Sequence, residues 1–90
     1  MLTLAEAKLY LRVDYDEDDN LIEKFIESAK QLCMDILRTD DESILEEDRN
    51  SPVAMLYAIA YMYEHREEAD YNALTLSLRA LLSGNRKAVF

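Results

Sequence analysis

Ninety residues with one glycine, one proline and one cysteine carry a net charge of −9, and half of them are apolar. This length allows one small domain, and the scarcity of turn-forming residues argues against a sheet and favours long helices. A single cysteine excludes an internal disulfide and fits a reducing compartment. The negative charge disfavours binding to nucleic-acid backbones and to anionic membranes. No apolar run reaches the ~20 residues that span a bilayer.

The first two helices are predicted over about residues 4–12 and 17–38. Thr3 and Glu6 have the T-x-x-E spacing of a capping box, which marks the start of the first helix. In the second helix the apolar residues other than Met34 fall within one arc of about 160°, which predicts a helix lying on a core. This arc consists of Leu21, Ile22, Phe25, Ile26, Ala29, Leu32, Cys33, Ile36 and Leu37.

An acidic connection over residues 39–50 precedes the third predicted helix. Ile44 and Leu45 are expected to pin this connection to the core on one short helical turn. Ser51 is predicted to cap the third helix, with Pro52 at its first position, where the missing N–H costs nothing. The helix is then expected to continue to about residue 68.

The third helix is apolar on every side. Residues 53–63 are all apolar or tyrosine, so they cover the whole circumference. Few helices of so small a domain can be buried all round. We therefore expect this helix to be shared between the core and a partner.

The fourth helix is predicted over about residues 71–83, capped by Asp70 and ended by Gly84, the one glycine. Leu76 lies opposite its leucine stripe, so the helix is expected to face two ways. That stripe consists of Leu74, Leu78, Leu81 and Leu82. The chain is thus predicted to be an all-α, four-helix domain over residues 1–84.

Residues 85–90 form a tail of different character. Residues 1–84 contain eight basic and nineteen acidic side chains, a net charge of −11, whereas the tail carries Arg86 and Lys87 and ends in Phe90. Opposite charges attract across an interface. The tail is therefore expected to be an arm that docks on an acidic neighbour.

Acidic residues before the second helix raise the question of a metal site. Asp14, Asp16 and Asp18 have the spacing of a calcium loop, but an EF-hand also needs glycine at loop position 6 and glutamate at position 12, where this chain has Asp19 and Phe25. The favoured interpretation is that these carboxylates complement the helix dipole, with a weak calcium site as the alternative.

No constellation for catalysis is present in the sequence. His65 has no second histidine to form a zinc motif, and Cys33 lies within the apolar arc of its helix, where it is expected to be a small core residue. No phosphate-binding or nucleophile motif occurs. We expect no catalytic, metal or cofactor-binding residue, and hence no enzyme.

The sequence gives more support to a protein-binding surface than to a catalytic or metal site. Tyrosine buries a large ring while its hydroxyl keeps a polar partner, which suits interfaces, although the same rings can also fill the core. Arg66 is expected to pair with a carboxylate of its own helix or of a neighbouring subunit. The interface candidates are Tyr57, Tyr61, Tyr63, Arg66, Leu76, Arg86, Lys87 and Phe90.

With its helices placed, the whole chain resembles the head–tail connector (adaptor, or putative DNA-packaging) family of long-tailed bacteriophages. Residues 2–14 are similar to the short first helix of that family, and residues 21–29 to its long second helix. The sharpest similarity is over residues 52–69, especially Tyr63-Glu64-His65-Arg66-Glu67-Glu68-Ala69. Residues 78–82, followed by Arg86, resemble the closing helix and basic-aromatic tail of the family.

The resemblance implies a structural subunit, without catalytic residues or cofactors, that forms a ring of about twelve copies at the virion neck after assembly in the host cytoplasm. Such a ring docks on the portal protein, receives a head-closure or tail protein, and lets DNA pass through an acidic channel that does not grip phosphates. The alternative is a small acidic helical module or regulator that acts on a basic partner.

Overall fold

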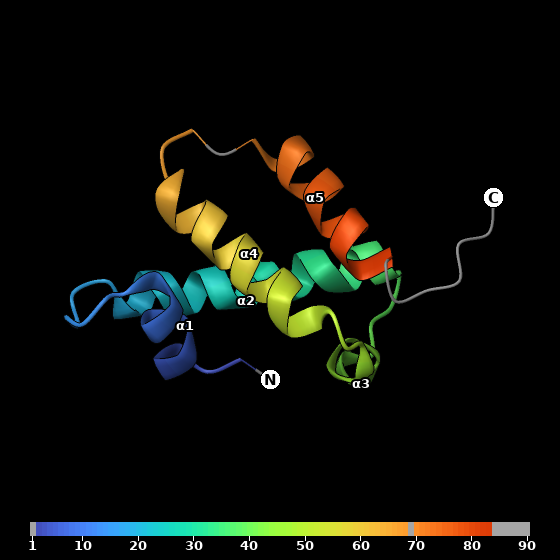
Figure 1. The fold of residues 1–90 in the computed structure, drawn as a ribbon, viewed down its shortest axis with the longest axis horizontal. Coiled ribbons are helices and arrows are strands. Elements are labelled where there is room, and N and C mark those ends of the chain that lie inside the picture. Colours follow the sequence, from blue (N-terminus) through green and yellow to red (C-terminus); the bar gives the residue numbers. More distant parts are fainter. Residues whose placement is uncertain (1, 69, 84–90) are drawn as a thin grey trace.

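The computed structural model describes residues 2–68 and 70–83, which are all-helical apart from turns and connections (Figure 1). The elements are α1 (Leu4–Leu11), α2 (Asp19–Leu37), α3 (Glu42–Glu47), α4 (Ser51–Glu64) and α5 (Tyr71–Ser83). The predicted all-α class is confirmed. Among the described residues, no helix has both the length and the apolarity to cross a membrane.

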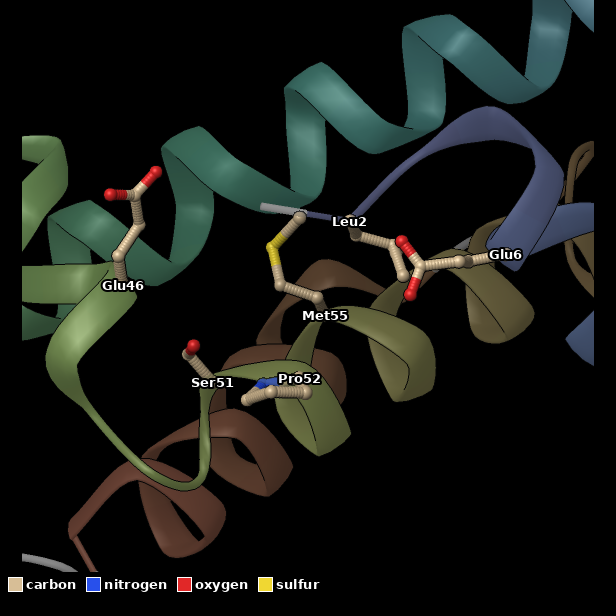
Figure 2. Close-up of a pocket in the computed structure, with 6 residues that line it drawn as sticks. All are labelled: Leu2, Glu6, Glu46, Ser51, Pro52 and Met55. Atoms are coloured by element: carbon tan, nitrogen blue, oxygen red, sulfur yellow. The ribbon is translucent and has the colours of Figure 1, made fainter.

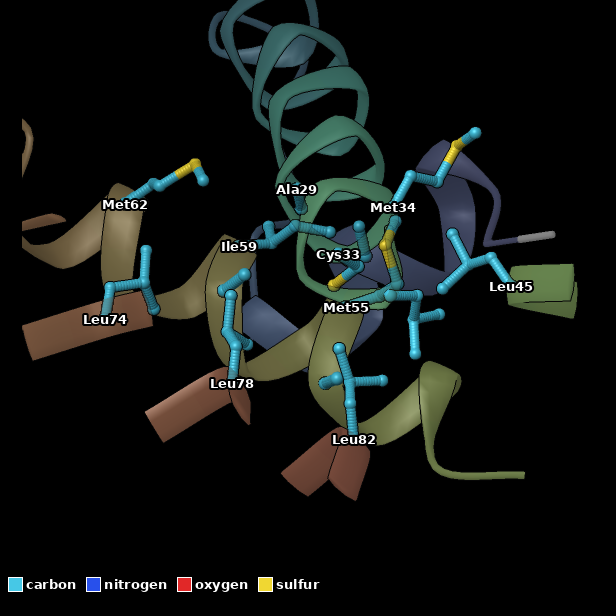
Figure 3. Close-up of a cluster of buried hydrophobic side chains, with 14 of the residues drawn as sticks. Ala29, Cys33, Met34, Leu45, Met55, Ile59, Met62, Leu74, Leu78 and Leu82 are labelled. Atoms are coloured by element: carbon cyan, nitrogen blue, oxygen red, sulfur yellow. The ribbon is translucent and has the colours of Figure 1, made fainter. Parts of the chain in front are cut away.

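The long helix α2 forms one layer, and α1, α4 and α5 pack against it as a second layer. Figure 1 shows α1 and α5 toward opposite ends of α2, with α4 crossing between them. The core lies where α4 and α5 meet α2, and Figure 3 shows Leu78 of α5 close to Ile59 of α4. Its largest fully buried side chains are Ile22, Leu45, Met55, Ile59, Leu74, Leu78, Leu82 and Cys33.

The predicted helix starts are confirmed at α1 and α5. The Thr3 hydroxyl accepts from the Glu6 amide at 3.2 Å, while the Glu6 carboxylate accepts from the Thr3 amide at 3.0 Å, so the capping box is complete. The Asp70 carboxylate accepts from two amides of the first turn of α5, each at 3.1 Å. Both caps satisfy amides that have no partner within their helix.

Two helix boundaries and one cap differ from the prediction. The start of α2 is Asp19, two residues later than predicted, and α4 ends at Glu64, four residues earlier. Glu64, Glu67 and Glu68 oppose the dipole at a helix C-terminus, which explains the early end of α4. The N-cap of α4 is Asn50, not Ser51. The side-chain Nδ2 of Asn50 donates to the Leu81 carbonyl at 2.8 Å, and this bond links the start of α4 to α5.

The acidic connection contains the short helix α3, as the prediction of one helical turn anticipated. Leu45 is fully buried and anchors it, whereas Ile44, which was expected to help, is exposed. A six-residue helix presents one narrow face, so only one of two adjacent residues can reach the core. Gly84 and the tail residues Arg86, Lys87 and Phe90 lie outside the described residues.

Candidate interaction surfaces

The outer side of α4 carries an apolar stripe. Val53, Tyr57, Ala60 and Glu64 recur at spacings of four, three and four residues, so they lie on one side of the helix. Val53 is 57% exposed and Tyr57 is 41% exposed, although both belong to the segment that the sequence predicts to be apolar all round. Because the described residues leave Val53 and much of Tyr57 exposed, α4 has a face available for a partner.

Helix α5 extends the same surface. The Tyr57 hydroxyl donates to the Ser77 hydroxyl at 3.3 Å, which links the outer sides of the two helices. Leu76, next to Ser77, is 65% exposed, while Leu78 is fully buried. Leu76 therefore lies on the side of α5 away from the buried leucines, and its contact with a partner stays a prediction. We call Val53, Tyr57, Ala60, Glu64 and Leu76 the α4–α5 face.

A second exposed apolar surface lies on α1. Ala5 and Leu9 share the outer side of this helix, at a spacing of four residues. Leu9 is 81% exposed and the adjacent Tyr10 is 53% exposed. This surface, which we call the α1 face, contains none of the interface residues predicted from the sequence. The one sequence feature that points to it is weak: Leu9 lies opposite the apolar edge that α1 turns toward the core.

Tyr63 belongs to a polar cluster that fastens the loop before α2 to the end of α4. Its hydroxyl donates to Asp18 Oδ2 at 2.8 Å and lies 3.0 Å from the Tyr15 hydroxyl. The Arg66 guanidinium lies 3.6 Å from Asp18 Oδ2 and stacks over the Tyr63 ring at 4.8 Å. Arg66 thus pairs with a carboxylate of another element in its own chain.

The hydrogen bonds of this cluster make the Tyr63 phenol a weaker acid. Its contact with Tyr15 and then its bond to the Asp18 carboxylate raise the pKa of Tyr63 above the ordinary 10.0, because both favour the protonated phenol. The folded chain therefore keeps this proton at pH values where the unfolded chain loses it. The resulting stability is complete below about pH 10 and is lost as pH rises toward the folded pKa.

We expect Tyr63→Phe to lower the free energy of unfolding by about 1 kcal/mol near pH 8, because one hydrogen bond to a carboxylate is lost. Near pH 11 the difference between the two proteins should shrink, since ionisation of Tyr63 in the unfolded chain then weakens the wild type. Urea unfolding at both pH values measures it. A difference that stays the same at both pH values would contradict the role given to this proton.

Tyr61 also has partners within the chain. Its ring stacks on His65 with centroids 4.3 Å apart, and its hydroxyl accepts from the Asp70 amide at 2.9 Å. His65 Nδ1 lies 3.0 Å from the Tyr61 carbonyl. Tyr61 and His65 therefore hold the segment between α4 and α5. Of the five interface candidates within the described residues, Tyr57 and Leu76 leave the most exposed apolar surface. Tyr61, Tyr63 and Arg66 organise neighbouring segments.

The acidic residues around the start of α2 bond to different partners. Asp18 bonds to the tyrosines, whereas Asp16 Oδ1 lies 2.9 Å and Asp19 Oδ1 2.7 Å from Lys8 Nζ. Hydrogen bonds to Asp19 and Asp16 raise the pKa of Lys8, and the bond from Lys8 lowers that of Asp16. Within residues 2–68 and 70–83, no three His, Cys, Asp or Glu side chains are grouped as a metal site.

One open cavity, of about 410 Å³, lies where α1, α3 and α4 meet (Figure 2). Leu2, Pro52 and Met55 give it apolar walls, and the Glu6 and Glu46 carboxylates lie at its edge. The Glu6 carboxylate already accepts from Thr3 as part of the capping box. Cys33 is buried in the core, where burial raises the pKa of its thiol to about 11, so the thiol is protonated at neutral pH.

Comparison with known proteins gives one family. The model of phage gp6-like head–tail connector proteins matches residues 1–82. This range contains α1 to α4 and all but the last residue of α5. No curated protein and no solved structure matches the chain.

Proposed function

Because this chain belongs to the phage gp6-like head–tail connector family, we propose that it is a subunit of a ring at the virion neck. The ring docks on the portal protein of the filled head, receives a head-closure or tail protein, and lets DNA pass through its channel. This is a structural role in the phage particle, and it requires no cofactor. The ring assembles in the host cytoplasm. The observation that carries the proposal is the family match over nearly the whole chain.

The distribution of exposed apolar surface supports a ring of identical subunits. A head-to-tail ring needs two different contact surfaces on each copy. The α1 face and the α4–α5 face are two such surfaces, and they lie on different helices. We propose that Tyr57 and Leu76 contact a neighbouring copy directly, and that Tyr61, Tyr63 and Arg66 keep the adjoining segments in place for that contact.

The charge of the chain supports passage of DNA without retention. Nucleic-acid affinity comes mainly from basic side chains that displace counterions from phosphates. A body with a net charge of −11 supplies little of this affinity. A channel lined by such subunits repels phosphates instead of gripping them, so DNA slides through without a sequence-specific contact.

The ring is tested by the mass of the particles in solution. We expect multi-angle light scattering to show a closed oligomer at high protein concentration or after addition of the portal protein of the same phage, and negative-stain images to show rings. A chain that stays monomeric under both conditions would contradict the proposal. A one-to-one complex with a basic partner, without rings, would favour an acidic binding module.

We further propose that Arg86, Lys87 and Phe90 form an arm that docks on an acidic neighbour. Deletion of residues 85–90 is expected to leave the helical domain folded, because the core lies within residues 2–82. It should weaken binding to the portal protein about ten-fold or more, since two cations and one aromatic ring are lost. Circular dichroism measures the fold of the deletion variant, and a binding titration measures its affinity for the portal protein. An unchanged affinity would contradict the proposal of a docking arm.

A further inference from the structure

The cavity between α1, α3 and α4 combines apolar walls with carboxylates at its edge. Leu2, Pro52 and Met55 form the walls, and Figure 2 shows Glu46 and Glu6 on opposite sides of them. Its volume of about 410 Å³ leaves room for an aromatic ring, because a dry cavity of roughly 150 Å³ already holds benzene. The chemistry that fits this cavity is an apolar group accompanied by cations.

The two carboxylates at the edge are available to a cation. Among the ion pairs of the described residues, none includes Glu46 or Glu6. Both hydrogen bonds that Glu6 accepts from Thr3 go to Oε1, so Oε2 keeps its capacity to accept. A cation that approaches the edge therefore meets two carboxylates with which no described lysine or arginine is paired.

The C-terminal segment of the chain has the matching chemistry. Residues 84–90 contain Arg86 and Lys87, two of the ten basic residues, and then Val89 and Phe90. The basic pair comes three to four residues before Phe90, which is roughly 10–14 Å of extended chain. A ring placed in the cavity therefore leaves both cations near its edge, where they attract the carboxylates.

The last turns of α5 lie close to this cavity. The Asn50 side chain donates to the Leu81 carbonyl at 2.8 Å. The next two residues, Ser51 and Pro52, line the cavity. The cavity lies on the opposite side of α4 from Tyr57, which contacts α5, so a chain leaving α5 has to pass one helix, ~10–12 Å across. Residues 84–90 span roughly 23–25 Å when extended, which is long enough to reach the cavity of their own chain.

We propose that residues 86–90 bind in the cavity between α1, α3 and α4 of their own chain, with the Phe90 ring between the apolar walls and Arg86 and Lys87 beside the two carboxylates. A segment tethered by a short linker is present at a millimolar effective concentration, so a contact with a sub-millimolar dissociation constant is mostly occupied. One copy is enough for this contact, which therefore does not depend on the ring. Docking of the same arm on a neighbour then requires its release from the cavity.

A peptide of residues 85–90 tests the site and its occupant together. The labelled peptide is titrated into the full chain and into a variant that lacks residues 85–90, both at concentrations where light scattering shows monomers. Fluorescence polarisation is expected to show binding to the deletion variant, and binding at least ten-fold weaker to the full chain, whose cavity is already occupied. Replacement of Phe90 by alanine in the peptide should weaken its binding to the deletion variant about ten-fold or more.

Charge reversal at the edge of the cavity identifies the site. Glu46→Lys, made in the deletion variant, should weaken binding of the peptide about five-fold or more. Glu47→Lys is the matched control, because Glu47 is the next residue of α3, is also exposed, and does not line the cavity. Circular dichroism checks that both variants keep the fold. Equal weakening by the two substitutions would show attraction to the total charge alone and would overturn the site.

Two other results would also overturn the proposal. Equal affinity of the peptide for the full chain and for the deletion variant would show that the arm does not occupy its own cavity, and would point to the cavity of another copy. Absence of binding to the deletion variant would exclude the contact altogether. Neither result bears on the ring, which is tested separately by the mass of the particles with portal protein.

Discussion

Replacement of Leu78 by alanine is expected to lower the free energy of unfolding by about 2–5 kcal/mol, the range for removal of a buried leucine side chain. Leu78 is fully buried and lies close to Ile59 (Figure 3). In a domain of this size, about 3 kcal/mol corresponds to a fall in Tm of roughly 12–24 °C. Thermal and urea unfolding followed by circular dichroism measure the change.

Leu76→Ala is the matched control for this substitution, because it makes the same chemical change on the same helix two residues away. Leu76 is exposed, so its loss should change the free energy of unfolding by less than about 0.5 kcal/mol. If the α4–α5 face receives a neighbouring copy, Leu76→Ala should instead weaken assembly. Equal losses of stability in both variants would show that α5 does not divide its two sides between core and partner.

Helical periodicity predicted most of the fold because few side chains oppose it here. The arc of α2 indicated the side that packs on the core, and the capping box and Asp70 marked two helix starts. Pattern alone places Met34 outside that arc, yet it is buried. Burial of such a residue depends on which segment covers it, and that is a tertiary property.

The candidate site was harder to predict than the fold. Apolar residues all round α4 indicated a shared helix, but not which side the partner takes. The contacts of Tyr63 with Tyr15 and Asp18 join residues more than forty positions apart. Leu9 was missed because a single leucine outside the apolar edge of a short helix carries little periodic signal. Only the packed structure shows that it is the most exposed large apolar side chain among the described residues.

Asp18→Ala should have the second largest effect, a loss of about 2 kcal/mol in the free energy of unfolding. Its Oδ2 atom accepts from Tyr63 at 2.8 Å and from Tyr15 at 3.3 Å, and it faces Arg66. Hydrogen bonds to a charged group are worth about 1.5–3 kcal/mol, and removal of the carboxylate leaves Arg66 without its counter-charge. Urea unfolding of the two proteins gives the difference.

Asp16→Ala is the control within the same acidic run, since its side chain is 90% exposed and its ion pair with Lys8 is worth little in water. We expect a loss below about 0.5 kcal/mol. The same pair of variants distinguishes a structural carboxylate from a calcium ligand, because an ion that binds the folded chain raises Tm with its concentration. Millimolar calcium should leave the Tm of wild type and variants unchanged, as Asp18 is committed to Tyr63 and Asp16 to Lys8. A calcium-dependent rise in the wild type that Asp16→Ala removes would instead identify this loop as a cation site.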